Sequence, residues 1–250
     1  MVHSILILGQ SNMGGRGYKA DVEPIVNNQI YALRNGRWRA MYVPVNPDRV
    51  TSGINLVESF ADRYQKDHGV KVGIIPCADG GTSIDQWAVG SLLFDHACYM
   101  AELAQRTSTI VAVLWHQGES DCDAVNSVGY KEKLSVIIEA FRDRLGIHDV
   151  PFILGGLGDY LEENPRTHFR DYYKKINEAS MSIAREGKLI GYAPADGLGS
   201  NPDLLHFSAV ALREFGERYY EVFLTLEDKN RVFEDRNTFD SGIKTEIENL

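Results

Sequence analysis

The sequence predicts an α/β fold built on a parallel sheet, and three observations support this prediction. Five short apolar runs recur along the chain, each long enough for a buried strand. Between them lie segments in which apolar residues recur every three or four positions, as on one face of an amphipathic helix. The runs contain few polar residues, which is typical of parallel strands covered by helices on both faces. Strands that alternate with helices in this way form βαβ units.

The elements follow in a regular order. The five strands are predicted at residues 5–8, 70–76, 109–115, 151–155 and 189–193. Helical spacing of apolar residues predicts helices that include residues 56–64, 93–104, 134–145, 172–183 and 212–223. Each strand is thus separated from the next by at least one helical segment, as a parallel sheet requires.

Two regions fall outside this alternation. Residues 18–54 form a long polar excursion in which the apolar residues 29–33 predict a small hairpin around Asn35-Gly36. The segment after residue 226 is polar and charged. We therefore predict one domain over residues 1–226 and a peripheral C-terminal arm over residues 227–250. The sequence contains no internal repeat.

The composition narrows the class of protein. The 250 residues are 44% hydrophobic and 24% charged, as in an ordinary globular protein. The net charge of −9 argues against a nucleic-acid partner, which needs a basic face. The sequence shows neither a signal-peptide pattern nor an apolar stretch of about 18 residues, so no membrane association is expected. The odd cysteine count, Cys77, Cys98 and Cys122, favours a reducing, cytoplasmic setting.

Polar residues gather where the predicted strands end. Ser11 follows the first strand, Gly80-Gly81 the second, and Gln117 and Glu119 the third. The segment from Asp203 to His206 follows the fifth strand. Since the carboxyl ends of parallel strands lie at one edge of a sheet, where ligands of open α/β sheets bind, we expect these groups to meet there.

Together these residues could perform acyl transfer. Ser11 is the candidate nucleophile, and His206 is the candidate base that removes its proton. The base needs an acceptor for its other ring nitrogen, and Asp203, three residues earlier, is favoured for that role. Glu119 is the alternative acid. His116 is the strongest rival of His206, although its position at a strand end favours local packing.

A tetrahedral oxyanion needs fixed hydrogen-bond donors. The candidates are the backbone N–H of Ser11, the N–H of Gly81 (with Gly80 as the fallback) and the side-chain amide of Gln117. The nearby Arg16 has two alternative roles. It could bind a substrate carboxylate or hydroxyl, or it could pin the glycine-rich loop to a neighbouring acid.

The blocks Gly9-Gln10-Ser11-Asn12-Met13, Gly80-Gly81-Thr82, Trp115 to Ser120 and Asp203-Leu204-Leu205-His206 resemble the ordered motifs of the SGNH (GDSL-like) hydrolase superfamily. More narrowly, they resemble its sialate O-acetylesterase and acetyl xylan esterase (carbohydrate esterase family 6) branch. The resemblance implies a flavodoxin-like three-layer α/β/α sandwich and a serine esterase that needs neither a metal nor a cofactor. It further implies removal of O-acetyl groups from sugars. Most superfamily members carry an oxyanion-hole Asn where this chain has Gln117.

Other functions fit the sequence less well. The spacing of Gly9 and Gly14 resembles a phosphate-binding loop, but Gly15-Arg16 stands where Lys-Ser/Thr is required. An inactive carbohydrate-binding relative would not need the serine, histidine and carboxylate that this chain retains. We therefore expect an acetyl xylan esterase-like enzyme, with a sialate O-acetylesterase or a general small-ester hydrolase as alternatives. Its expected partners are an acetylated carbohydrate and possible further copies of itself.

Overall fold

The computed structural model describes residues 2–231 and 233. Of the predicted C-terminal arm, residues 227–250, only 227–231 and 233 fall within this range; the rest of that prediction lies outside the described residues. In the described part of the chain, no helix combines the length and the apolar character needed to cross a membrane.

A seven-stranded sheet forms the centre of the molecule, in the order β3-β2-β4-β1-β5-β6-β7. Five of its strands are the predicted ones, and all five run parallel. Among these five, the strand order is the 2-1-3-4-5 arrangement of flavodoxin-like folds, which reverses direction between β1 and β5. The predicted strands are β1 (Val2–Gly9), β4 (Lys71–Pro76), β5 (Thr109–His116), β6 (Phe152–Gly155) and β7 (Ile190–Ala193).

The two additional strands come from the predicted hairpin. β2 (Ile30–Arg34) and β3 (Arg37–Ala40) pair antiparallel, and β2 also pairs parallel with β4. Asn35 and Gly36 both have positive φ, at 50° and 73°, as a tight two-residue hairpin turn requires. The expected count of about five strands is therefore low by two, because this hairpin joins the edge of the sheet.

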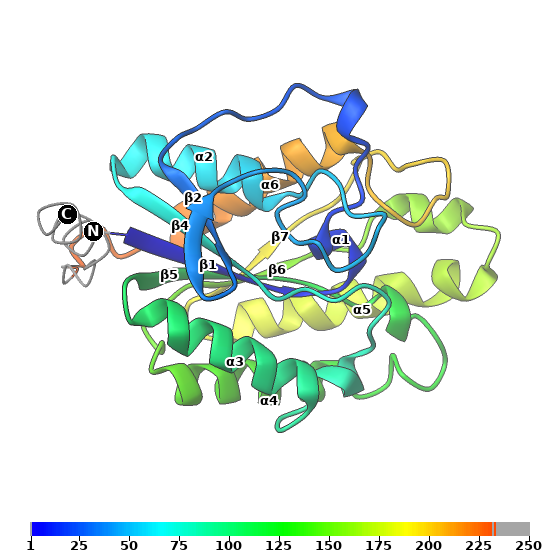
Figure 1. Cartoon of the computed structure of the whole chain (residues 1–250). Helices are drawn as coiled ribbons and strands as arrows, with labels where there is room; N and C mark the ends of the chain where they lie inside the picture. The colour runs from blue at the N-terminus through cyan, green and yellow to red at the C-terminus, as the bar shows by residue number, and fades with distance from the viewer. Residues whose placement is uncertain (1, 232, 234–250) are drawn as a thin grey trace, which may run out of the picture.

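Helices cover both faces of the sheet (Figure 1), which gives the three layers predicted. α2 (Val57–His68) and α6 (Ala209–Leu226) lie on one face, and α3 (Leu92–Gln105), α4 (Tyr130–Leu145) and α5 (Thr167–Glu186) lie on the other. β1 alternates between the two cores. Ile5 and Ile7 pack on the side of α2 and α6, and Leu6 and Leu8 pack on the side of the other three helices.

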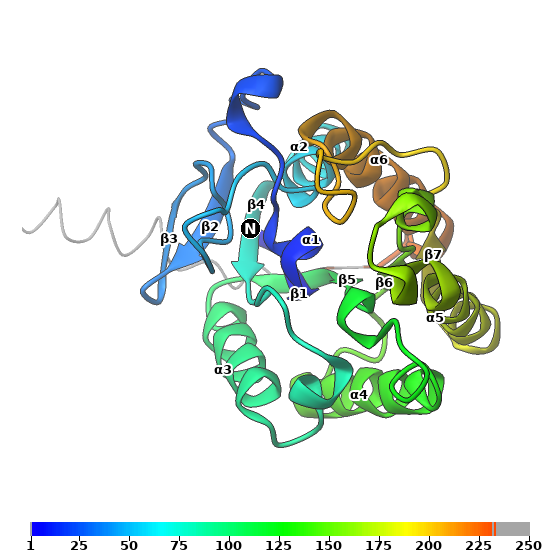
Figure 2. The same ribbon diagram turned by 90° about the vertical axis from the view of Figure 1, so that its right-hand side faces the viewer.

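The carboxyl edge of the sheet carries the short elements. Figure 2 looks onto this edge and shows α1 (Ser11–Gly14) near its middle. α1 directly follows β1, next to the point where the strand order reverses. Four short 3-10 helices complete the elements of the described residues: η1 (Lys19–Asp21), η2 (Ile84–Trp87), η3 (Glu119–Asp121) and η4 (Asp159–Glu163).

Candidate active site

A close backbone approach places Ser11 at the end of β1. Gly9 has a φ of 127°, and a Cβ at this residue would lie 2.0 Å from the carbonyl oxygen of His116. Only glycine lets the chain leave the strand here. The next residue, Gln10, donates its N–H to that same carbonyl at 2.9 Å. Ser11 then begins α1 with its side chain on the pocket side.

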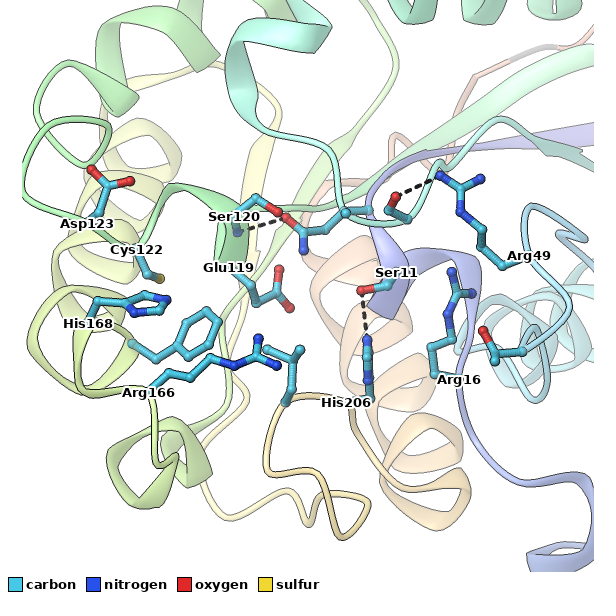
Figure 3. A pocket seen from close by; sticks show the side chains of 16 residues that line it. Ser11, Arg16, Arg49, Glu119, Ser120, Cys122, Asp123, Arg166, His168 and His206 are labelled. Carbon is cyan, nitrogen blue, oxygen red and sulfur yellow. Dashed lines mark hydrogen bonds between the residues drawn. The ribbon is translucent and has the colours of Figure 1, made fainter.

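Ser11, His206 and Asp203 form one continuous hydrogen-bonded series. Ser11 Oγ lies 3.0 Å from His206 Nε2, and His206 Nδ1 lies 2.6 Å from Asp203 Oδ2. Figure 3 shows the side chains of Ser11 and His206 pointing toward one another, joined by this hydrogen bond. The three side chains come from β1–α1 and from the loop before α6, which are nearly 200 positions apart along the chain.

The Asp203 carboxylate is held in its ionised form. Burial acts to raise its pKa, but the N–H and the imidazole of His206, together with the N–H of Leu205, lower the pKa below its ordinary value. An ionised carboxylate only accepts hydrogen bonds, so Nδ1 of His206 carries the proton. Nε2 is then left with a lone pair directed at the Ser11 hydroxyl, the tautomer that a general base needs.

Glu119, the alternative acid, has other partners. Its Oε1 accepts hydrogen bonds from His116 Nε2 at 3.0 Å and from Asn12 Nδ2 at 2.5 Å. Within the described part of the chain, neither a hydrogen bond nor an ion pair joins it to His206. The geometry therefore places Asp203, and not Glu119, against the candidate base. His116, the rival histidine, is fully buried beside Glu119.

The structure corrects the expectation for Gln117. Its Nε2 faces three protein acceptors: Gln10 Oε1 at 3.1 Å, Thr82 O at 2.9 Å and Asp121 Oδ2 at 2.5 Å. An amide nitrogen has only two protons, so none is left for a substrate. Gln117 is also 1% exposed and does not line the pocket.

Gln10 places a side-chain amide beside Ser11, in the position expected for that of Gln117. Its Oε1 accepts from Gln117 Nε2 and from the backbone N–H groups of Gly118 and Ser120, at 3.1–3.3 Å. These three donors fix which end of the amide is oxygen. Gln10 lines the pocket beside Ser11, and none of the described residues accepts from its Nε2. The sequence carried one signal for this residue, which is its position directly before Ser11.

The backbone N–H groups of Gly80 and Gly81 differ in whether the protein already provides an acceptor. Gly80 donates to Asp48 Oδ2 at 2.8 Å, so this fallback donor is already occupied. Gly81, with a φ of 80°, lines the pocket, and its N–H has no acceptor among the described residues. Arg16 holds the same Asp48 in a buried ion pair at 2.7 Å. Of its two alternative roles, Arg16 therefore pins the glycine loop.

The pocket above Ser11 has a volume of about 670 Å³. Figure 3 shows Arg16 and Arg49 on one side of Ser11, and Arg166 and His168 on the other. Arg16 and Arg49 are both paired, with Asp48 and Asp79. Among the described residues, the guanidinium of Arg166 has no carboxylate partner, and its recorded contact is with the ring of Phe169. In the described part of the chain, no group of three or more His, Cys, Asp or Glu side chains is arranged to hold a metal ion.

Comparison with known proteins identifies the family of this chain. Residues 2–225 match the family described as carbohydrate esterase, sialic acid-specific acetylesterase. The chain is 27% identical over 247 residues to a probable carbohydrate esterase of Arabidopsis thaliana, covering 88% of this chain and 89% of the relative.

Solved structures show the same fold. An X-ray structure of a protein from Arabidopsis thaliana superposes with a TM-score of 0.80 at 25% identity, covering 89% of this chain and 98% of the other. NanS superposes with a TM-score of 0.71 at 17% identity, covering 90% and 97%. A carbohydrate acetylesterase from Xanthomonas citri gives 0.64 at 18% identity, covering 89% of this chain and 56% of the other. The chain is thus a carboxylic ester hydrolase, and it belongs to the sialic acid-specific acetylesterase family of carbohydrate esterases.

Proposed function

We propose that this protein removes O-acetyl groups from carbohydrates with Ser11 as nucleophile, His206 as general base and Asp203 as the acid that orients it. One observation carries the proposal: the 3.0 Å and 2.6 Å contacts that join the three side chains at an open pocket. An inactive carbohydrate-binding relative would have no use for this alignment.

The reaction follows from the geometry in two steps. His206 Nε2 takes the Ser11 proton while Oγ attacks the ester carbonyl, and the imidazolium is stabilised by Asp203. His206 then returns the proton to the departing sugar oxygen, which leaves an acetylated Ser11. Water, deprotonated by the same imidazole, attacks this acyl-enzyme. The acyl–Oγ bond then breaks, acetate leaves, and His206 returns the proton to Ser11 Oγ. The oxyanion of each tetrahedral intermediate is stabilised by the N–H groups of Ser11 and Gly81 and by Gln10 Nε2.

One arginine at the pocket, Arg166, supports an acidic sugar as substrate. Arg166 is exposed at the rim, and Figure 3 shows its side chain extending toward the Ser11–His206 pair. A guanidinium without a protein carboxylate can bind a carboxylate of the substrate through two parallel hydrogen bonds. This favours an acetylated sialic acid over an acetylated xylo-oligosaccharide, whose backbone is neutral.

Acetate-release assays test both the nucleophile and the substrate of this proposal. The wild-type protein should hydrolyse p-nitrophenyl acetate, and Ser11→Ala should abolish this activity while the circular dichroism spectrum stays unchanged. Retained turnover in Ser11→Ala would contradict the assignment of the nucleophile.

The substrate is tested with two acetylated sugars. Wild-type kcat/KM should be higher for acetylated sialic acid than for acetylated xylo-oligosaccharides, and Arg166→Ala should lower the first value by up to about fivefold without changing the second. Equal losses on both substrates would instead assign Arg166 a structural role, and a preference for the xylo-oligosaccharides would support an acetyl xylan esterase.

We also propose a reducing intracellular setting, supported by the three cysteines, all of which are free and buried. Cell fractionation tests this proposal, and recovery of the protein in the medium would contradict it.

A further inference from the structure

Three buried side chains connect the turn that carries Ser11 to the loop that carries His206. They are Asn12, Glu119 and His116, which are 0–3% exposed. We infer that Asn12 is a positioning residue that sets the placement of His206 relative to Ser11, and that Glu119 acts through Asn12. This inference rests on the proposed roles of Ser11 and His206.

Asn12 holds the peptide groups on both sides of the base. Its Nδ2 donates to the carbonyl oxygen of Leu205 at 3.1 Å, and its Oδ1 accepts from the N–H of Phe207 at 3.1 Å. Because Asn12 follows Ser11 within α1, the nucleophile and the two flanks of the base are joined through one rigid amide. A shift of His206 away from Ser11 would stretch both bonds.

Glu119 determines which way the Asn12 amide faces. Its Oε1 lies 2.5 Å from Asn12 Nδ2 and also accepts from His116 Nε2. An ionised carboxylate only accepts, so it selects the NH₂ end of the amide. In the reversed orientation, the amide oxygen would face Oε1, and the NH₂ group would face the N–H of Phe207. Both contacts would then be repulsive, so Glu119 excludes this orientation.

The charge on Glu119 persists although the side chain is buried. Burial acts to raise its pKa, but the hydrogen bonds and the field of His116, together with the hydrogen bond from Asn12, lower the pKa below its ordinary value. Glu119 therefore remains an acceptor throughout the neutral range. Breaking such a buried arrangement on one side is costly, because the remaining charge loses its partners.

A second asparagine holds the same loop from the opposite side and provides a matched control. Asn164 Nδ2 donates to the carbonyl oxygen of Leu204 at 2.7 Å, and Asn164 is 6% exposed. It lies between η4 and α5, away from the Ser11 turn. Asn164 thus stabilises the loop without connecting it to the nucleophile.

The test compares Asn12→Ala with Asn164→Ala, measuring kcat and KM on p-nitrophenyl acetate together with Tm. Asn12→Ala should lower kcat about 100-fold with little change in KM, since an error of about 1 Å in placement costs that much. Asn164→Ala should lower Tm by an amount similar to that of Asn12→Ala, but it should lower kcat far less. Equal losses of kcat in the two variants would overturn the inference.

Two further variants test the part played by Glu119. Glu119→Gln keeps an acceptor and should retain most of the activity, whereas Glu119→Ala should reproduce the kcat of Asn12→Ala. Combining Asn12→Ala with Glu119→Ala should lower kcat no further than either change alone. Additive losses of kcat would show that Glu119 does not act through Asn12. If Asn12→Ala does not fold, Asn12→Asp keeps the size but sets two carboxylates together, and it should lose kcat equally. Turnover by the wild type and its loss in Ser11→Ala report separately on the proposed function.

Discussion

The molecule contains two histidine–carboxylate pairs with the same spacing of three residues, and they differ in what the histidine faces. His206 and Asp203 lie at the pocket, 20% and 47% exposed. His116 and Glu119 are 0% and 3% exposed. The second ring nitrogen of His206 meets the Ser11 hydroxyl, whereas that of His116 is buried without a hydrogen-bond partner among the described residues. What the second ring nitrogen faces, and not the spacing, distinguishes a candidate base from a structural histidine.

The two pairs are nevertheless connected. Asn12 bonds to Glu119 of the buried pair and to the peptide groups that flank His206 of the exposed pair. The exposed pair is thus placed for proton transfer, and the buried pair supports the element that holds it. Exchanging carboxylates for amides in each pair should separate these two roles.

The largest expected effect is on the exposed pair. Asp203→Asn should lower kcat about 10⁴-fold, because an amide at this position favours the wrong imidazole tautomer. Glu119→Gln should lower kcat far less, because Gln still accepts from Asn12. Steady-state acetate release from both variants measures the difference. A greater loss in Glu119→Gln would reverse the assignment of the acid.

The next effect concerns two glutamines, Gln10 and Gln117, whose side chains are hydrogen-bonded to each other. Gln10→Ala should lower kcat by about 10²–10³-fold with a small change in KM, because the amide is used mainly in the transition state. Gln117→Ala should lower Tm more and kcat less, since this side chain supports Gln10 and lies outside the pocket. The ratio of the two kcat losses is the readout. A greater kcat loss in Gln117→Ala would return the oxyanion role to that residue.

The smallest expected effect is on stability, through Asp121, which accepts from Gln117. Burial raises the pKa of Asp121 to about 6 from the ordinary 3.8. Between these two values the folded protein holds a proton that the unfolded chain does not, so stability falls as pH rises from about 4 to 6. The size of this contribution is about 3 kcal/mol.

Replacing Asp121 by Asn removes the titration while retaining an acceptor for Gln117. The free energy of unfolding of Asp121→Asn, relative to that of the wild type, should therefore rise as pH increases through this window. Denaturant titrations at pH 4, 5, 6 and 7 measure it. A difference that stays constant with pH would show that Asp121 is not protonated in the folded protein at low pH.

The sequence predicted the fold and the meeting of distant residues better than the roles of neighbouring ones. Apolar runs located five of the six parallel strands, and the rule for their carboxyl ends brought Ser11 and His206 to one edge. The sequence pointed to Gln117, and not to Gln10, as the amide donor. Both residues directly follow neighbouring strands, and only the three donors on Gln10 Oε1 show whose amide nitrogen remains free.

Two other features also required the three-dimensional structure. Arg16 has its partner, Asp48, 32 residues away in a polar segment with no periodic pattern to predict its path. The role of Asn12 depends on the two peptide groups beside His206. Because every residue has the same backbone groups, the sequence does not show which of them a side chain will bind.

Trapping the acyl-enzyme tests the central claim most directly. The wild-type protein is mixed with p-nitrophenyl acetate, quenched in acid within milliseconds, digested and examined by mass spectrometry, with Ser11→Ala treated in parallel. We expect one added acetyl group on the peptide that contains Ser11, and none on that peptide in the variant. Turnover by the wild type with acetylation at another residue, or with equal acetate release by Ser11→Ala, would contradict the account.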